Sequence, residues 1–312
     1  MRELTVNRND AGQRLDKFLS KALRALPPSL MYKLIRTKKI KLNRKRAEPQ
    51  SLLCEGDTIQ LFIKEEFFET DPKKHIKTLR PTLNIIHEDS DILLCFKEAG
   101  QLVHAGDDGD ESDTLISHIQ AYLYSKGEYD PDSENSFAPA LCNRIDRNTS
   151  GIVIAAKNAE ALRRMNEAIK ERSITKKYLA AVHGIPAKKE DTLTGYLMKD
   201  ENKNEVRVFE KPPHGMKVGG RLKTIVTKYR VLASKNGLSL LEVELVTGRT
   251  HQIRAHLASI GHPLLGDGKY AHNADDRRIG YSYQALCAYS LTIDGKEYTV
   301  DREKIGFLEV FG

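Results

Sequence analysis

The segment 143–151 reads Asn-Arg-Ile-Asp-Arg-Asn-Thr-Ser-Gly and places Asp146 between Arg144 and Arg147, directly before an apolar run at 152–156. Flanking positive charge keeps an aspartate ionised at neutral pH. An ionised aspartate can act as a nucleophile or as a base, and loops at the ends of rigid strands are where such groups are placed. The alternative is an ordinary surface Asp–Arg pair followed by a polar turn.

A second segment, 247–256, reads Thr-Gly-Arg-Thr-His-Gln-Ile-Arg-Ala-His. It leads from a strand into a helix expected over 250–259. Because helix N-termini attract anions, Arg249 and its neighbours could face a phosphate or a carboxylate. His251 and His256 are one residue too far apart for a helical metal-binding pair, and no acidic residue supplies a third ligand, so no metal is expected.

A third segment, Lys-Lys-Tyr at 176–178, contributes Tyr178, a residue type that is more often packed in a core than functional. The chain has no Walker loop, no Gly-x-Gly-x-x-Gly and no Gly-x-Ser-x-Gly. The sequence therefore indicates no nucleotide and no other cofactor.

Hydrophobic spacing predicts the elements that position these segments. Asn158 is expected to cap a helix at 159–171, and two hairpins are expected to turn at Asn236-Gly237 and Asp294-Gly295. Strands are expected at 83–86, 92–96, 102–104, 151–156, 177–182, 224–232 and 238–246, with a helix at 114–124 and a polar loop at 126–139. Strands outnumber helices and follow one another directly, which predicts an α+β fold on a mixed, largely antiparallel sheet.

The first 64 residues predict a separate small helix-helix-strand domain. Apolar residues at 15, 18, 19, 22 and 23 form one stripe of a helix over 14–24. Ser29 is expected to cap a second helix at 30–36, and strands are expected near 40–42 and 59–63. The expected organisation is a domain at 1–64, a charged linker at 65–80 and a larger domain at 81–312.

The excess positive charge lies entirely in this first domain. Residues 1–64 contain 15 lysines and arginines against 6 acidic residues, a net of +9, whereas the remainder of the chain has a net of −2. Such asymmetry favours a module that binds a polyanion, with nucleic acid preferred over a merely solvated surface. Its basic side chains cluster at Lys38, Lys39, Arg44, Lys45 and Arg46.

Composition excludes several classes of protein. With 312 residues, 40% hydrophobic and 30% charged, the chain can bury a core but is too charged for a membrane protein. It has no apolar run of about 18 residues and no apolar signal sequence at its start. Its cysteines, Cys54, Cys95, Cys142 and Cys287, are widely spaced without a Cys-x-x-Cys pair. They are expected to be buried free thiols in a reducing cytoplasm.

The three segments resemble motifs of the RluA family of RNA pseudouridine synthases: His-Arg-Leu-Asp-x-x-Thr-Ser-Gly, Lys-x-Tyr and Gly-Arg-x-His-Gln-Ile-Arg. The stretch 261–267 is similar to a further part of that family, and residues 12–64 resemble the RNA-binding domain of ribosomal protein S-four. Asn143 stands where many members have His. Glu98-Ala99-Gly100 replaces the usual turn after Lys97. Both departures concern the choice of substrate more than the chemistry.

The resemblance implies conversion of uridine to pseudouridine in RNA, without redox cofactor, nucleotide or metal. It implies that Asp146 is essential as nucleophile or base, that Arg254 pairs with it, and that Tyr178 stacks on the target base. Arg144 would fill the space of a flipped-out uridine, and Arg147 and Arg249 would contact RNA. Large-subunit ribosomal RNA is the favoured target and transfer RNA the second, with no obligate protein partner. The alternatives are a non-catalytic RNA-binding or ribosome-assembly factor and a small-nucleoside enzyme.

Overall fold

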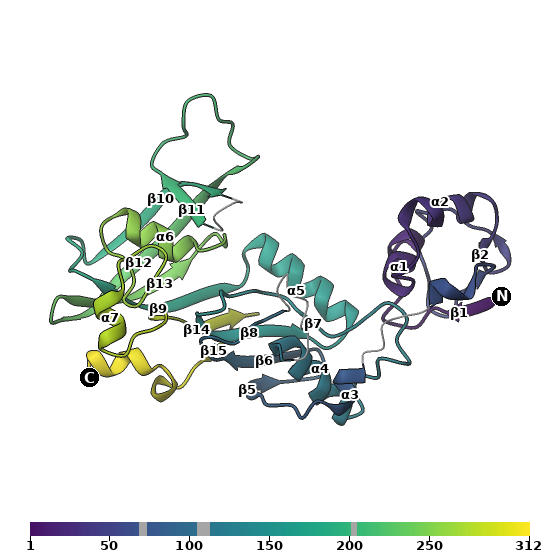
Figure 1. Cartoon of the computed structure of the whole chain (residues 1–312), viewed down its shortest axis with the longest axis horizontal. Helices are drawn as coiled ribbons and strands as arrows, with labels where there is room; N and C mark the ends of the chain where they lie inside the picture. Colours follow the sequence, from purple (N-terminus) through teal and green to yellow (C-terminus); the bar gives the residue numbers. More distant parts are fainter. Residues whose placement is uncertain (69–73, 105–112, 201–204) are drawn as a thin grey trace.

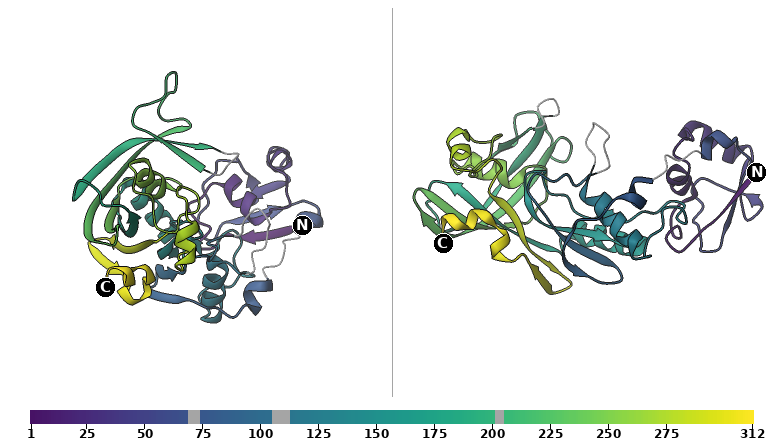
Figure 2. Two further views of the ribbon diagram at one scale, coloured as in Figure 1. Left: turned by 60° about the vertical axis from the view of Figure 1, so that its left-hand side comes forward. Right: turned by 60° about the horizontal axis from the view of Figure 1, so that its bottom comes forward.

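The computed structural model describes residues 1–68, 74–104, 113–200 and 205–312. The chain forms a small N-terminal domain and a larger body, which lie side by side along the long axis of the molecule (Figure 1). The right-hand view of Figure 2 shows the same separation. No helix within the described ranges is long and apolar enough to cross a membrane.

The N-terminal domain packs two helices against a four-stranded sheet. Its helices are α1 (Leu15–Ala22) and α2 (Pro28–Arg36), and its strands pair in the order β1 (Arg2–Thr5), β4 (Thr58–Leu61), β2 (Ile40–Leu42), β3 (Lys45–Arg46). The predicted apolar stripe is confirmed, because Leu15, Phe18 and Leu19 are fully buried. The prediction that Ser29 caps the second helix is wrong. That helix begins at Pro28, where proline is favoured because the first helical N–H has no partner in the helix.

The body contains one large sheet and several helices. Its strands are β5 (Asn84–Glu88), β6 (Ile92–Lys97), β7 (Ala140–Leu141), β8 (Ser150–Ala156), β9 (Thr175–His183), β10 (Glu190–Asp200), β11 (Glu205–Phe209), β12 (Leu222–Lys235), β13 (Leu238–Leu245), β14 (Leu286–Ile293) and β15 (Lys296–Thr299). Its helices are α3 (Lys74–Thr78), α4 (Leu115–Ser125), α5 (Ala159–Glu171), α6 (Gln252–Ser259) and α7 (Ala274–Arg278), and short 3-10 turns occur at Glu65–Phe68, Arg302–Lys304 and Gly306–Val310.

Within the described residues the strand order is β11-β10-β12-β13-β9-β14-β8-β6-β5, with β15 paired to β14 and β7 to β8. The pair β14–β8 is parallel and the others are antiparallel. The prediction of a mixed, largely antiparallel sheet is therefore confirmed. Both predicted hairpin turns are present, with left-handed backbone at Asn236, Gly237, Asp294 and Gly295.

Three local predictions are wrong. Residues 102–104 form no strand, because their backbone bonds to the start of α4 instead. The helix expected from residue 250 begins at Gln252, after a left-handed backbone at His251. Of the four cysteines expected to be buried, Cys95 and Cys287 are buried, but Cys142 is half-buried and Cys54 is exposed, since the neighbouring Leu53 takes the core position.

Helices cover both faces of the sheet and divide its core in two. Ile152 and Ile154 of β8 pack into one cluster with α5, whereas the alternating Val153 and Ala155 pack into another with α4 and α6. Tyr178 of β9 belongs to this second cluster. Tyr178 and the helix α6 that carries Arg254 therefore lie on the same face of the sheet.

The stretch 65–80, expected to be a linker, ends in structure that belongs to the body. Its helix α3 packs against α4, and Ile76 is buried there. The N-terminal domain also contacts the body directly through polar groups. The fully buried Asp10 accepts hydrogen bonds from Asn135 and from the amide and hydroxyl of Ser136, at 2.6–3.2 Å. The predicted polar loop 126–139 therefore forms part of the junction between the domains.

Gly151 lies where β8 meets β14. Its φ is +127°, and a Cβ atom there would lie 2.4 Å from the backbone N and O of Ala288. Only glycine allows the two strands to approach this closely. The glycine that ends the segment 143–151 thus fixes the strand that follows Asp146.

We expect Gly151→Ala to lower the free energy of unfolding by about 3 kcal/mol or more, because Ala288 cannot move without displacing its strand. Gly280→Ala is the matched control, since Gly280 also has a positive φ (+99°) but nothing within 4 Å of its added Cβ. It should cost only about 1 kcal/mol of backbone strain. Urea unfolding measures both, and equal losses would contradict the close-approach explanation.

Candidate active site

Asp146 lies in the loop that joins β7 to β8, and Asn143 braces the start of this loop. The Asn143 amide donates to the carbonyl of Ile152 (3.3 Å), and its side-chain oxygen accepts from the amide of Ile154 (2.7 Å). The asparagine that replaces the histidine of the resembled motif thus ties the loop to β8. Its position explains how the substitution leaves the loop ordered.

Lys97, at the end of β6, is completely buried beside this loop. Its ammonium group donates to the carbonyls of Glu98 (2.7 Å), Gln101 (3.0 Å) and Arg147 (2.7 Å). Burial lowers the pKa of Lys97 to about 8, although the charge of Asp146 acts in the opposite direction. The three carbonyls use all three N–H groups of the ammonium. Lys97 therefore holds the backbone next to Asp146.

Arg254 of α6 joins two aspartates from distant parts of the chain. Its Nη1 donates to Asp146 Oδ2 (2.9 Å), and its Nε and Nη2 donate to the two oxygens of Asp267 (2.7 and 2.9 Å). Burial disfavours the charged forms of both Arg254 and Asp267, but the hydrogen bonds and the attraction between their opposite charges outweigh this effect. The pKa of Arg254 is raised and that of Asp267 is lowered. The predicted pairing of Arg254 with Asp146 is confirmed.

The two carboxylates differ in access to solvent. The Asp146 side chain is 27% exposed, whereas the Asp267 side chain is fully buried. Among the described residues, Arg254 donates to Asp146 Oδ2, and no hydrogen bond to Oδ1 is present. Asp146 is therefore the carboxylate that can meet a substrate, and Asp267 serves to hold the arginine.

Tyr178 of β9 is buried on the same face of the sheet. Burial raises the pKa of Tyr178, and the negative charge of Asp146 raises it further. The side chain is therefore an uncharged phenol at neutral pH. The structure brings Asp146, Tyr178 and Arg254 into one region, as the resemblance implies.

Asp267, His251 and Tyr270 also belong to this region, although the sequence analysis assigned them no role. Asp267 ends the stretch 261–267. His251 lies within the segment that resembles the Gly-Arg-x-His-Gln-Ile-Arg motif. His251 Nε2 is 3.8 Å from Asp146 Oδ2, and its Nδ1 is 2.8 Å from the hydroxyl of Tyr270. Among the described residues, no group of three His, Cys, Asp or Glu side chains could hold a metal ion.

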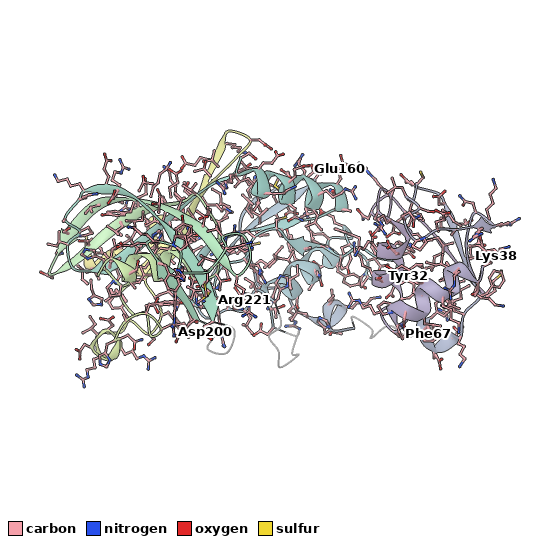
Figure 3. The ribbon with its side chains drawn as sticks, turned by 90° about the horizontal axis from the view of Figure 1, so that it is seen from above. Tyr32, Lys38, Phe67, Glu160, Asp200 and Arg221 are labelled. Atoms are coloured by element: carbon pink, nitrogen blue, oxygen red, sulfur yellow. The ribbon has the colours of Figure 1, made fainter. Side chains whose placement is uncertain are left out.

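The arginines proposed to contact RNA are exposed near this region. Arg144, Arg147 and Arg249 all face solvent, and Arg147 donates to the carbonyl of Gly100 (2.9 Å). The five basic residues of the N-terminal domain, Lys38, Lys39, Arg44, Lys45 and Arg46, are exposed as well. Lys38 lies at the end of that domain far from the body (Figure 3). The fold does not bring these five residues to Asp146.

A groove of about 910 Å³ opens beside the Asp146 loop. It is lined by Arg147 and Gly100 from the loop region and by Phe96, Leu102 and His118, among others. Arg147 is its link to the segment 143–151, whereas Asp146, Tyr178 and Arg254 do not line it.

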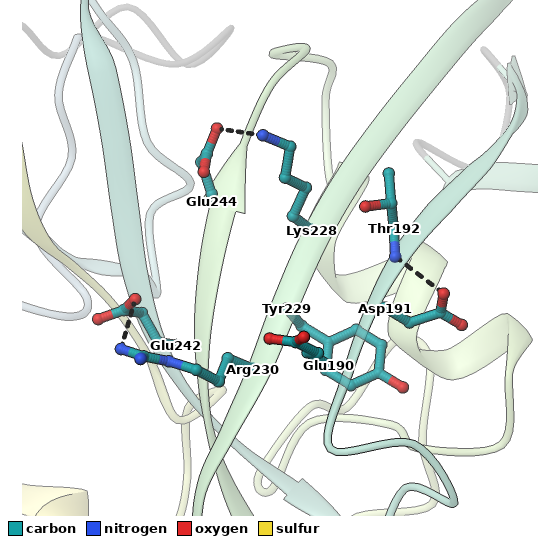
Figure 4. Close-up of a pocket in the computed structure, with 8 residues that line it drawn as sticks. All are labelled: Glu190, Asp191, Thr192, Lys228, Tyr229, Arg230, Glu242 and Glu244. Carbon is teal, nitrogen blue, oxygen red and sulfur yellow. Dashed lines mark hydrogen bonds and ion pairs between the residues drawn. The ribbon is translucent and has the colours of Figure 1, made fainter.

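A second hollow, about 460 Å³, lies over β10, β12 and β13. Its charged side chains pair with one another, Lys228 with Glu244 (3.0 Å) and Arg230 with Glu242 (3.3 Å) (Figure 4). None of the three proposed catalytic residues lines it. We assign it no part in the chemistry.

Comparison with known proteins now identifies the class of protein. Residues 91–259 match the RNA pseudouridylate synthase family, and residues 13–59 match the S4 domain. The chain belongs to the RNA pseudouridylate synthase family. It is an isomerase of that class, and the family expected from the three motifs is confirmed.

The curated relatives are more specific. The chain is 31% identical over 277 residues to ribosomal large subunit pseudouridine synthase C of Buchnera aphidicola subsp. Baizongia pistaciae, covering 86% of this chain and 80% of that protein. It is 29% identical over 279 residues to the protein of the same name from Escherichia coli, covering 88% of this chain and 82% of that protein.

Two solved human structures share the fold. They are RNA pseudouridylate synthase domain containing 1, with a TM-score of 0.53 at 22% identity, and domain containing 4, with a TM-score of 0.56 at 19% identity. Each covers 72% of this chain, and the match covers 83% and 92% of the human chains, respectively.

Removing either of the two carboxylates that bind Arg254 should change the stability of the fold by a different amount. We expect Asp267→Ala to destabilise the fold by about 3–5 kcal/mol, because it leaves a buried arginine charge without its main partner. Asp146→Ala should cost less than about 1 kcal/mol, since Asp146 is partly exposed and Asp267 still neutralises the arginine. Thermal unfolding of the two variants measures the difference. A larger loss for Asp146→Ala would refute the division of roles.

Proposed function

We propose that this enzyme converts uridine to pseudouridine in large-subunit ribosomal RNA, with Asp146 as the catalytic residue. The observation that carries the proposal is the accessible Asp146 carboxylate, which the buried Arg254 holds through one oxygen. The relatives named above support the choice of RNA, since both are named for the ribosomal large subunit. A ribosomal RNA substrate also fits the cytoplasmic location expected from the sequence.

The reaction rearranges one nucleotide without adding or removing atoms. The bond from C1′ of the ribose to N1 of uracil breaks, the base turns, and a bond from C1′ to C5 forms. The proton on C5 leaves and N1 gains a proton. Asp146 acts at the ribose, as a nucleophile or as a base. Arg254 orients its carboxylate, because the Arg254 Nη1 donates to Oδ2 at 2.9 Å.

The target base must leave its stack to reach Asp146. We propose that Tyr178 stacks on the flipped uracil and, as an uncharged phenol, exchanges protons with it. The exposed Arg144 would fill the space that the base vacates. Arg147 and Arg249 would bind the neighbouring phosphates, beside the groove described above.

We further propose that residues 1–64 form an RNA-binding domain that acts at a distance from the chemistry. Its exposed basic side chains lie far from Asp146, so they attract RNA without touching the target uridine. The contacts of Asp10 with Asn135 and Ser136 keep the domain at a defined position relative to the body. Long RNA can then contact both parts at once.

We expect Asp146→Asn to reduce isomerisation by at least about a thousandfold, equivalent to about 4 kcal/mol of barrier. RNA affinity should change only a few-fold, because the substitution is nearly isosteric. The assay is release of tritium from C5-labelled uridine in a large-subunit ribosomal RNA transcript. Asp275→Asn is the control, since its side chain is 85% exposed and pairs only with Arg278 among the described residues. Activity within about tenfold of wild type would refute the catalytic assignment.

Reversing charge in the N-terminal domain should weaken RNA binding without slowing chemistry. We expect the combined change of Lys38, Lys39, Arg44 and Arg46 to Glu to make the plot of log RNA affinity against log salt concentration shallower by about 2 to 4. Its slope reflects the number of counterions released on binding, and each lost phosphate contact removes about one of them. Turnover at saturating RNA should fall much less than affinity.

The control for this experiment reverses four exposed basic residues of the body that lie outside the three motif segments, namely Lys235, Arg278, Lys296 and Lys304. It changes the net charge of the chain equally and should leave most of the salt slope intact. Equal effects of the two sets would show that net charge, and not the N-terminal domain, attracts RNA.

A further inference from the structure

His251 faces the carboxylate of Asp146, the proposed catalytic residue. It immediately precedes α6 with a left-handed backbone (φ +51°), a conformation that few side chains adopt. Its side chain is 10% exposed, and its Nε2 lies 3.8 Å from Asp146 Oδ2. Strained backbone of this kind is retained where the surrounding structure requires it, often at functional sites.

Tyr270 determines which nitrogen of His251 carries the hydrogen. The hydroxyl oxygen of Tyr270 accepts a hydrogen bond from the amide of Val206 (3.0 Å), and burial raises the pKa of Tyr270 to about 12, so the hydroxyl keeps its hydrogen. Among the described residues, His251 Nδ1 is the acceptor within reach of that hydrogen, at 2.8 Å. A ring that accepts at Nδ1 from this hydroxyl carries its own hydrogen on Nε2, toward Asp146.

The surroundings of His251 favour an uncharged ring. Burial lowers the pKa of His251, and the charges of Arg254 and Lys269 act in the same direction, whereas Asp146 and Asp267 oppose them. Arg254 already supplies the cation that Asp146 requires. A neutral N–H donor can therefore orient the carboxylate without adding a second charge.

We propose that His251 is a positioning residue, whose Nε2–H, fixed by Tyr270, keeps Asp146 Oδ2 turned toward Arg254 and leaves Oδ1 to act on the ribose. Both groups that face the carboxylate approach the same oxygen, Oδ2. At 3.8 Å the contact is longer than a hydrogen bond, and the proposed role requires it to shorten when RNA fills the site. This inference rests on the proposed function, because it gives Asp146 its geometry for that reaction.

Replacing His251 with Gln or with Asn distinguishes a positioning role from a purely structural one. Gln places its N–H₂ group near the position of His Nε2, whereas Asn reaches only the position of Nδ1. Asn, however, tolerates a left-handed backbone much better than Gln does. If His251 mattered only for the fold of the α6 start, His251→Asn would be the better replacement. The proposal predicts the opposite order for catalysis.

We expect His251→Asn to lower kcat by about 30- to 100-fold, the effect of losing one hydrogen bond to a charged group. His251→Gln should stay within about tenfold of wild type. The KM for the ribosomal RNA transcript should change little in either variant, and the tritium-release assay measures both constants. Asn retaining as much kcat as Gln, or more, would overturn the proposal.

The position of the hydrogen can be tested without activity. In the full-length protein labelled with ¹⁵N-histidine, we expect His251 Nδ1 to show the shift of an unprotonated nitrogen at neutral pH and Nε2 that of a protonated one. Tyr270→Phe should remove this preference and lower kcat in the same direction as His251→Asn. A hydrogen on Nδ1 in the wild-type protein would refute the inference.

These outcomes are distinguishable from failure of the proposed function. If Asp146→Asn keeps its activity, the proposed role of Asp146 fails whatever His251 does. If Asp146→Asn is inactive while both His251 variants match wild type, Asp146 retains its role and only the positioning role of His251 is wrong.

Discussion

A buried arginine shared between two aspartates is the interaction on which this site depends. Taking the Arg254 guanidinium out of water is costly unless its donors are paired, and Asp267 satisfies it with two hydrogen bonds from inside the fold. The remaining Nη1 is then directed at Asp146. Because one carboxylate is buried and the other is partly exposed, a single cation both stabilises the fold and orients the proposed catalytic carboxylate.

The backbone around Asp146 is held in place by contacts with several strands. Lys97 holds the carbonyl of Arg147 from the end of β6, and Asn143 ties the other end of the loop to β8. Gly151 lets β14 approach β8 so closely that the strand after the loop cannot shift. Each contact restrains the loop from a different strand, so the position of Asp146 is determined by the sheet as a whole.

In the proposed function, the N-terminal domain attracts the RNA and the body carries out the chemistry. Electrostatic attraction acts over about a Debye length and needs no exact geometry, so a basic domain can act from a distance. Catalysis needs groups placed within tenths of an ångström, and the nearly neutral body supplies them. The junction through Asp10 and Ser136 is polar. These hydrogen bonds help to hold the two domains together.

The sequence by itself determined the features that depend on local spacing: the α1 stripe, the cap at Asn158, whose side chain bonds to the amide of Ala161, the turns at Asn236-Gly237 and the basic cluster of the first domain. Its motifs also indicated Asp146, Tyr178 and Arg254. Only the tertiary structure decided the surroundings of Asp146, because Arg254 and His251 reach it through packing between distant segments, while Asp267 and Tyr270 contact Arg254 and His251 in turn. Strand β1 escaped prediction for the same reason, since it forms against β4, which lies far away in the chain.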